Sequence, residues 1–289
     1  MYVLRTNADL EPWRADTAWV AFVPTMGALH EGHESLIRQA AAAARGHPGG
    51  ACLVSIFVNP TQFNDPADLA RYPRTIENDL ECCRRSGADA IYVPGPEDIY
   101  PPGESIPIPP LPDVAILPQL EDSHRPGHFA GVCQVVLRLL RLARPHEALF
   151  GEKDWQQFRV IDAMVESLGL PIRVVPIPTM RESDGLAMSS RNRFLSPAER
   201  RRAASLALAL EGAARLTDPG QAQRHMADVL TQAGATIEYA VVREARSLMP
   251  ISPGTFVPGA TPRRALIAAR IGSVRLIDNA PWPASLAGA

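Results

Sequence analysis

The first half of the chain alternates short apolar runs with helical patterns, and this order constrains the fold more than any other feature of the sequence. Residues 19–23 and 51–58 have the continuous apolar character of buried strands, and residues 31–45 between them have the pattern of a helix. Strands that alternate with crossover helices are typical of a parallel sheet. The sequence therefore predicts an α/β fold built on a doubly wound parallel sheet.

The alternation continues as far as residue 175. It predicts helices at 75–86, 129–144 and 154–168, and strands at 90–93, 148–150 and 172–175. Residues 94–118 interrupt the pattern, because nine of these 25 residues are proline. Proline at that density predicts neither a helix nor a central strand. A loop of this length in a compact domain is usually functional or wraps the surface.

A stiff extended segment, Pro-Ile-Pro-Thr at residues 176–179, ends the alternation. Beyond it, Ser196-Pro-Ala-Glu is a helix start with a capping box. Two helices are expected next, and then strands at 236–242, 264–271 and 274–278 with a hairpin turn at 272–273. We therefore expect a Rossmann-like domain of residues 1–178 and a smaller α+β domain of residues 179–289 that acts partly as a lid.

Composition narrows the classes of function. The chain has 29 basic and 31 acidic residues, and its net charge of −2 gives no broad attraction to nucleic acid or anionic lipid. No apolar run approaches the ~20 residues that span a bilayer. Four scattered cysteines do not make a disulfide framework, and the first residues do not resemble a secretory signal. We expect a cytoplasmic protein with reduced thiols and with neither a nucleic-acid nor a membrane partner.

The strand-to-helix junction at residues 24–33, Pro-Thr-Met-Gly-Ala-Leu-His-Glu-Gly-His, carries the strongest functional signal. Ligands of open parallel sheets bind outside the carboxyl ends of the strands, and a helix start offers free N–H groups to phosphate. Gly27 and Gly32 have no Cβ, so a nucleotide can approach the backbone closely. His30 and His33 lie on one face of the first turn, where they could donate hydrogen bonds or a proton to a leaving pyrophosphate.

Two other interpretations of these histidines stay open. A helical histidine is often an ordinary surface or core residue, and His33 falls in register with Leu29 and Leu36. His-x-x-His can also ligate zinc, although no nearby cluster of cysteines or carboxylates completes the shell. We therefore assign no metal-ligating residues.

Two later segments contain the residue types that bind phosphate. Residues 151–157 follow a predicted strand and contain Lys153, which can supply a compact positive charge. Residues 184–193 lie beyond the extended segment and contain Ser189, Ser190 and Arg191, which offer hydroxyl donors and a planar guanidinium. Taken singly, Lys153 or Arg191 would more often be a solvated surface charge.

Together these segments resemble the pantothenate synthetase (pantoate–β-alanine ligase) family over nearly the whole chain. Residues 24–33 resemble that family's version of the His-x-Gly-His signature of nucleotidyl transferases. Further segments match family motifs in the same order: residues 55–63 (Ser-Ile-Phe-Val-Asn-Pro-Thr-Gln-Phe), 71–75 (Arg-Tyr-Pro-Arg-Thr), 127–131 (Gly-His-Phe-Ala-Gly), 151–154 (Gly-Glu-Lys-Asp) and 188–192 (Met-Ser-Ser-Arg-Asn). One such match is weak evidence, whereas the ordered set is specific.

The resemblance implies an ATP-dependent condensation of pantoate with β-alanine to pantothenate that releases AMP and pyrophosphate. The pantoate carboxylate would attack the α-phosphorus to give pantoyl adenylate, and the β-alanine amine would then displace AMP. The resemblance also implies Mg²⁺, carried mainly on the nucleotide phosphates with water completing its shell, and a homodimer.

The resemblance also implies a role for each site residue. Those that would bind ATP are Met26, Gly27, His30, His33, Gly151, Glu152, Lys153, Asp154, Met180, Met188, Ser189, Ser190 and Arg191. His33 would be the proton donor, His30 would hold phosphate beside it, and Lys153 would steady charge at the α-phosphorus. Gln62 and Gln157 would bind pantoate, Gln62 would also meet β-alanine, and Asn59 would help position that end.

The sequence departs from the family pattern at few positions. Trp155 stands where tyrosine is common in the family, and we expect its side chain to pack rather than react. The segment 77–79 resembles an acidic patch more than a metal site. The competing functions are a nucleotidyltransferase that stops at the adenylate or makes a cytidylyl product, and a nucleotide-sensing module without turnover.

Overall fold

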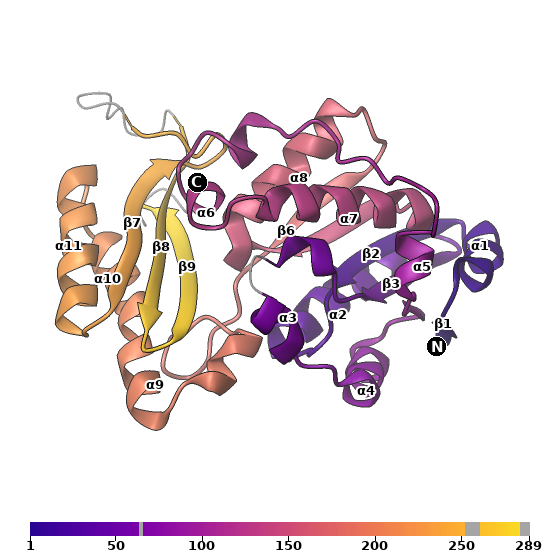
Figure 1. The fold of residues 1–289 in the computed structure, drawn as a ribbon, viewed down its shortest axis with the longest axis horizontal. Helices are drawn as coiled ribbons and strands as arrows, with labels where there is room; N and C mark the ends of the chain where they lie inside the picture. The colour runs from indigo at the N-terminus through magenta and orange to yellow at the C-terminus, as the bar shows by residue number, and fades with distance from the viewer. Residues whose placement is uncertain (64–65, 252–260, 284–289) are drawn as a thin grey trace.

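Two β-sheets organise the chain in the computed structural model, which describes residues 1–63, 66–251 and 261–283 (Figure 1). The first sheet has six strands in the order β1-β4-β3-β2-β5-β6, all paired in parallel. The second sheet has three antiparallel strands in the order β7-β8-β9. The predicted α/β fold, a doubly wound parallel sheet with a smaller α+β part, is confirmed.

The two sheets contain nine strands within the described residues, and eleven helices accompany them. The strands are β1 (Tyr2–Leu4), β2 (Trp19–Thr25), β3 (Gly50–Ile56), β4 (Ala90–Tyr92), β5 (Glu147–Gly151), β6 (Arg173–Ile177), β7 (Thr236–Glu244), β8 (Arg263–Ile271) and β9 (Val274–Trp282). The helices are α1 (Asn7–Ala15), α2 (Glu31–Arg45), α3 (Pro66–Arg71), α4 (Ile76–Ser86), α5 (Pro96–Ile99), α6 (Glu121–His124), α7 (His128–Ala143), α8 (Trp155–Ser167), α9 (Pro197–Ala203), α10 (Ser205–Ala213) and α11 (Pro219–Gln232). Within the described ranges, no helix combines the length and the apolar character needed to cross a lipid bilayer.

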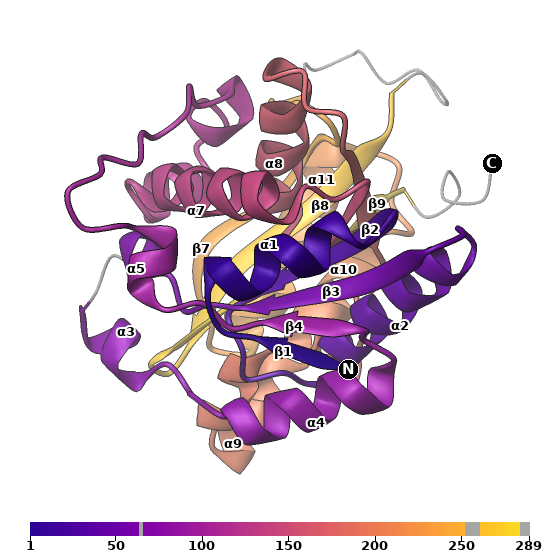
Figure 2. The ribbon, with the colours of Figure 1, turned by 90° about the vertical axis from the view of Figure 1, so that its right-hand side faces the viewer.

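Strand β2 lies in the middle of the first sheet and is buried on both faces. Val20 and Phe22 belong to the core cluster formed with α1, α7 and α8, whereas Ala21 and Val23 belong to the cluster formed with α2 and α4. Successive side chains of a strand point to opposite faces, so an unbroken apolar run is what this position requires. Figure 2 shows the two groups of helices on opposite sides of the strands.

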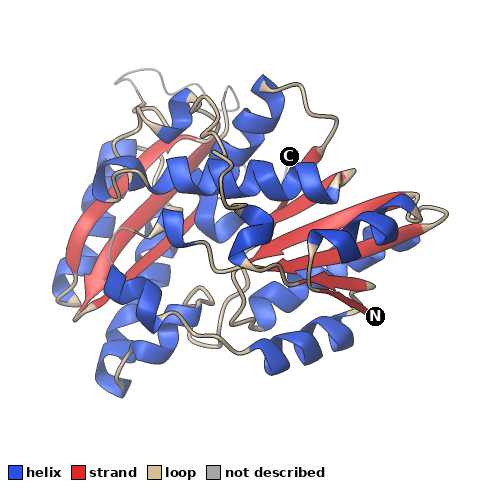
Figure 3. Cartoon of the chain, turned by 45° about the vertical axis from the view of Figure 1, so that its right-hand side comes forward, coloured by secondary structure: helices blue, strands red, loops and turns tan. Residues whose placement is uncertain are grey.

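The smaller sheet packs between its own helices and the first unit. Ile267 on β8 belongs to the cluster with α10 and α11, whereas its neighbour Leu266 belongs to the cluster of α7 and α8. Neighbouring side chains of β8 therefore pack against the two parts of the chain in turn. Figure 3 shows the two sheets on opposite sides of the molecule. The division into domains at residue 178 remains a prediction.

The structure corrects three local expectations. Residues 94–118 do contain a helical turn, α5, because Pro96 stands at its first position, where proline is tolerated. Pro176 and Ile177 lie in β6, where they pair with β5 at the sheet edge, and an edge strand accepts proline. Three helices, not two, follow Ser196, since α9 ends at Ala203 and α10 starts at Ser205.

The buried ring of Phe22 generates a stability prediction. Phe22→Ala should lower the free energy of unfolding by about 3–5 kcal/mol, because it removes a large side chain from a fully packed strand. Leu208→Ala on α10, where the leucine is 58% exposed, should change that energy by less than about 0.5 kcal/mol. Urea denaturation followed by circular dichroism measures both variants, and equal losses would contradict the assignment of Phe22 to the core.

Candidate functional site

The side chains of two histidines accept backbone hydrogen bonds at the junction of β2 with α2. His30 is the N-cap of α2, and its Nδ1 accepts from the backbone N–H of Gly32 at 3.2 Å. The Nδ1 of His33 accepts in return from the backbone N–H of His30 at 3.3 Å. The two ring centroids lie 4.1 Å apart. Because both Nδ1 atoms are acceptors, each neutral ring carries its hydrogen on Nε2.

Both histidines are uncharged near neutral pH. Burial, together with the nearby Lys153 ammonium, lowers the pKa of His30 to about 4. Burial lowers the pKa of His33 to about 3, with additional contributions from His30 and Lys153. The pair therefore offers two Nε2–H donors instead of two fixed cations.

A buried carboxylate on α4 fixes the turn that precedes these histidines. Asp79 accepts from the backbone N–H of Ala28 at 3.0 Å and of Leu29 at 2.8 Å. Gly27 has φ +79°, and a Cβ there would lie 2.9 Å from an Asp79 oxygen. The predicted acidic patch at 77–79 thus contains a carboxylate that accepts backbone hydrogen bonds from the turn. Gly27 allows the turn to form, and Gly27 does not line either of the cavities described next.

Two cavities share several lining residues, and His30 and His33 of this junction line the inner one. The inner cavity has a volume of about 250 Å³, and all the sequence-predicted site residues line it apart from Gly27 and Glu152: Met26, His30, His33, Asn59, Gln62, Gly151, Lys153, Asp154, Gln157, Met180, Met188, Ser189, Ser190 and Arg191. Imidazoles, an ammonium, hydroxyls and a guanidinium from three distant segments therefore meet in one space. The roles of these residues remain predictions.

Amide side chains form one end of the inner cavity. Asn59 is buried, and its Nδ2 donates to Gln62 Oε1 at 3.1 Å and to the carbonyl of Gly131 at 3.2 Å. A Cβ on Gly131 would lie 2.5 Å from the carbonyl oxygen of Thr61, so only glycine lets α7 approach this closely. The motif at 127–131 therefore acts by holding the segment that carries Asn59 and Gln62.

Strand β9 holds the loop that carries Lys153. Asn279 is buried, and its Nδ2 donates to the backbone carbonyls of Glu152 at 3.0 Å and Lys153 at 2.8 Å. Arg264 on β8 pairs with the Glu152 carboxylate at 2.7 Å and stacks 3.6 Å from the centre of the Trp155 ring. The Glu152 side chain is thus engaged by Arg264, and Trp155 packs, as expected from its position.

Asp278, the residue before Asn279, holds the segment that carries Met180 and Met188. The buried Asp278 carboxylate accepts from Arg181 Nη1 at 2.7 Å and Nη2 at 3.0 Å. Arg181 lies in a short hairpin in which the backbone N–H of Met188 donates to the carbonyl of Met180 at 3.0 Å. Adjacent residues of β9 therefore hold the segment with Lys153 and the segment with Met180 and Met188.

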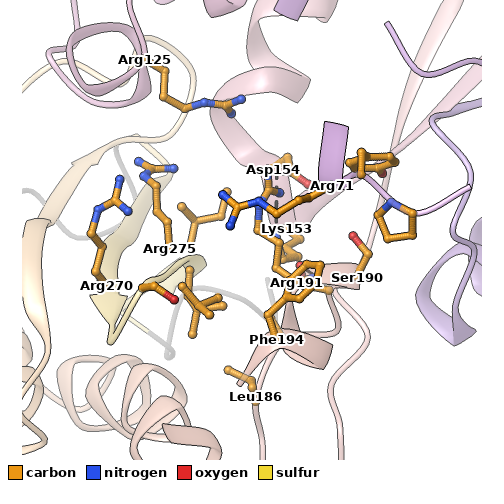
Figure 4. Close-up of a pocket in the computed structure, with 18 of the residues that line it drawn as sticks. Arg71, Arg125, Lys153, Asp154, Leu186, Ser190, Arg191, Phe194, Arg270 and Arg275 are labelled. Atoms are coloured by element: carbon orange, nitrogen blue, oxygen red, sulfur yellow. Dashed lines mark hydrogen bonds and ion pairs between the residues drawn. The ribbon is translucent and has the colours of Figure 1, made fainter. Parts of the chain in front are cut away.

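The outer cavity, of about 610 Å³, contains functional candidates that the sequence did not reveal (Figure 4). Arg270 and Arg275 line it, and it shares Tyr72, Arg125, Lys153, Asp154 and residues 189–191 with the inner cavity. Arg125 stands two residues before the motif at 127–131, and this position could have identified it as a site residue. Nothing in the local sequence distinguishes Arg270 and Arg275 from other arginines, because they are brought here by the β8–β9 hairpin.

The chain is similar to known proteins over nearly its whole length. A sequence profile described as Pantoate-beta-alanine ligase matches residues 2–281. The chain is 45% identical to a pantothenate synthetase of Rubrobacter xylanophilus, over 94% of each protein. It superimposes on the crystal structure of pantothenate synthetase from Thermus thermophilus with a TM-score of 0.87 and 39% identity, covering 97% of this chain and 99% of that one.

A second solved structure carries ligands. Pantoate-beta-alanine ligase from Francisella tularensis, described as complexed with beta-gamma ATP and beta-alanine, matches with a TM-score of 0.78 and 32% identity. The match covers 97% of each chain.

The lowered pKa values of His30 and His33 predict how these histidines titrate in solution. The Hε1 resonances of His30 and His33, assigned with His30→Gln and His33→Gln, should not titrate between pH 7.5 and 5.5 in the folded protein. Unfolded histidines protonate near pH 6.5, so the unfolded state takes up protons first and the stability due to these neutral rings falls as pH drops from about 6.5 toward 4. Titration of either resonance near pH 6.5 would contradict the buried neutral pair.

Proposed function

The chain belongs to the pantoate-beta-alanine ligase family, and we propose that its inner cavity is the active site for the ATP-dependent condensation of pantoate with β-alanine. The single observation that supports this location best is the meeting of His30, His33, Lys153 and residues 189–191 around one space, with Asn59, Gln62 and Gln157 lining the same space. Phosphate-binding groups and neutral amides are the two sets that a nucleotide and a hydroxy acid need.

The reaction proceeds in two displacements through pantoyl adenylate. A carboxylate oxygen of pantoate bonds to the α-phosphorus of ATP, and the bond from that phosphorus to the α,β-bridging oxygen breaks to release pyrophosphate. The β-alanine amine then bonds to the acyl carbon, loses a proton, and expels AMP. Activation is needed because an amine does not displace oxide from a carboxylate at neutral pH.

We assign the phosphate side of the cavity to four groups. The Nε2–H donors of His30 and His33 would bind phosphate oxygens as charge develops on the leaving pyrophosphate, and Lys153 would stabilise the α-phosphorus. Ser189 caps the turn at 190–194 by accepting from the N–H of Arg191 at 3.3 Å, which leaves its own O–H free to donate. The resemblance makes His33 the proton donor; in its neutral form the Nε2–H of His33 donates a hydrogen bond to the leaving group, and only the imidazolium form can transfer a proton.

We assign the pantoate side to amides because the ligand bears hydroxyls beside a carboxylate. Gln62 and Gln157 can both donate and accept, and neither places a fixed cation against the carboxylate that must attack. Asn59 cannot turn freely, since its Oδ1 also accepts from the hydroxyl of Tyr100 at 2.8 Å. Asn59 would therefore orient Gln62, which would also meet β-alanine.

Mg²⁺, the assembly and the location are further proposals. Of the described residues that line the two cavities, Asp154 is the only carboxylate, which suits an ion held chiefly by phosphates and water. Bound there, Mg²⁺ would neutralise phosphate charge. All four cysteines are buried and unpaired, which fits a reducing compartment such as the cytoplasm. Homodimeric assembly and a closing C-terminal lid stay predictions from the family resemblance.

The contacts of Asn279 generate a prediction for a positioning residue. Asn279→Leu removes both hydrogen bonds to the loop of Lys153 and should lower kcat of pantoate-dependent ATP–pyrophosphate exchange by about 10-fold or more, the scale for misplacing a catalytic group. KM for pantoate should change far less, because Gln62 lies on another segment and Gln157 is held in the first turn of helix α8. Steady-state exchange kinetics separates the two constants.

Asn7→Leu is the matched control for that variant. Asn7 also makes side-chain hydrogen bonds, to Asp98 and Tyr92, but lies outside both cavities. It should lose stability while kcat is kept. Equal effects of the two substitutions on kcat would show that Asn279 acts only through general stability.

Product analysis tests the proposed function directly. With ATP, pantoate and β-alanine, the chain should form pantothenate, AMP and pyrophosphate, and His33→Ala and Lys153→Ala should each lose about 100-fold or more in rate. Arg246→Ala removes an exposed ion pair with Glu166 and should be unaffected. ADP among the products would indicate an acyl phosphate route, and adenylate without pantothenate would support a nucleotidyltransferase instead.

A further inference from the structure

His128, the first residue of α7, is a buried histidine to which the proposed reaction assigns no role. The residue is 5% exposed and lines the inner cavity together with Gln62 and Arg125. Gly127 before it has φ +79°, a backbone conformation that favours glycine. The backbone N–H of His128 donates to the carbonyl of Arg125 at 3.0 Å. This turn places the imidazole between the side chain of Arg125 and the segment that carries Gln62.

The two ring nitrogens of His128 have partners that require a single tautomer. Nδ1 lies 3.0 Å from the backbone carbonyl oxygen of Gln62, which can only accept, so Nδ1 carries the hydrogen and donates. Nε2 lies 3.0 Å from Nη1 of Arg125, which can only donate, so Nε2 is the acceptor. Each contact alone fixes the same neutral form. It is the opposite tautomer to that of His30 and His33, whose hydrogens are on Nε2.

The imidazole of His128 is neutral near pH 7. Burial, together with the nearby Arg125 guanidinium, lowers the pKa of His128 to about 4. A neutral acceptor orients Arg125 without cancelling its charge, and the Glu121 carboxylate, 3.8 Å from Arg125 Nη1, is beyond direct hydrogen-bond distance. Arg125 lines both cavities together with Lys153 and Arg191, and Figure 4 shows these three side chains in the outer one. The charge of Arg125 therefore belongs to the phosphate side.

The same imidazole holds the pantoate side through the main chain of Gln62. The side-chain Oε1 of Gln62 accepts from Asn59 at 3.1 Å, while its backbone carbonyl accepts from His128. We propose that His128 is a positioning residue, which holds Arg125 and the segment of Gln62 in fixed relative positions through one neutral ring. This role rests on the proposed function, which assigns pantoate to Gln62 and phosphate to the cations.

Asparagine and glutamine can each replace one half of the imidazole. The Nδ2 of asparagine is as many bonds from Cβ as the Nδ1 of histidine, so His128→Asn keeps a donor for the Gln62 carbonyl and loses the acceptor for Arg125. The Oε1 of glutamine matches Nε2 of histidine in the same way, so His128→Gln keeps the acceptor and loses the donor. The two variants therefore separate the two contacts.

Steady-state kinetics of pantoate-dependent ATP–pyrophosphate exchange tests the positioning role. His128→Gln should raise KM for pantoate about tenfold, the scale of one lost hydrogen bond, and should change kcat/KM for ATP by less than about threefold. His128→Asn should lower kcat/KM for ATP about tenfold and change KM for pantoate by less than about threefold. The control His146→Gln removes an Nδ1 that accepts from the backbone N–H of Val20 at 3.1 Å, outside both cavities. It should leave both constants unchanged.

Equal effects of the two His128 variants on both constants would overturn the proposal, because either substitution would weaken a merely structural histidine alike. Unchanged constants in both variants would overturn it as well.

The tautomer of His128 gives a second test, which needs no substitution in the protein that is measured. The ¹⁵N chemical shifts of the ring nitrogens at neutral pH, assigned with His128→Gln, should place the hydrogen on Nδ1 in His128 and on Nε2 in His30 and His33. A hydrogen on Nε2 of His128 would contradict both of its contacts and end the proposal.

The positioning role and the proposed function can fail separately. If His128 has the stated tautomer but the wild-type chain makes no pantothenate, the hydrogen bonds stand and the proposed function fails. If pantothenate is formed and the two variants keep the wild-type constants, the proposed function stands and the positioning role fails.

Discussion

The parallel pairing of β2 with β3 on one side and β5 on the other is the constraint on which the site depends. All three strands end at the same edge of the sheet, and each is followed there by residues of the inner cavity: His30 after β2, Asn59 after β3 and Lys153 after β5. The chain order reverses between β2 and β5, which makes this the topological switch point of the sheet. Residues more than a hundred positions apart, such as His30 and Lys153, therefore meet at one edge of the sheet.

The inner cavity contains both neutral hydrogen-bond donors and cations. The two imidazoles accept backbone hydrogen bonds at Nδ1 and stay neutral because they are buried beside Lys153. They can then stabilise developing charge without repelling one another. Lys153, the only lysine of the chain, supplies a mobile point charge, whereas the arginines of the outer cavity are held in fixed orientation by Glu121 and Glu238.

Local patterns predicted much of the fold and most of the inner cavity, for physical reasons visible in particular residues. The apolar run at 19–23 indicates a central strand because Phe22 and Val23 are buried on opposite faces, and Ser196 indicates a helix start because its side chain caps α9. Strand β1 was missed because three residues are too few for a periodic pattern. Arg275 and Asn279 were missed because they are brought to the site by tertiary packing of β9, which leaves no mark on the neighbouring sequence.

The contacts of β9 bear on how the two parts of the chain work together. Asp278 and Asn279 are adjacent on one strand of the smaller sheet, yet one holds the hairpin of Arg181 and the other holds the loop of Lys153. A movement of this sheet as a lid would therefore move the backbone of Lys153 or break its hydrogen bonds. A boundary at residue 178 would cut through the core cluster that Leu248 and Leu266 share with α7 and α8, and the phosphate side of the proposed active site would require both parts. Closure and the placing of Lys153 would then be one event, because the same strand carries out both.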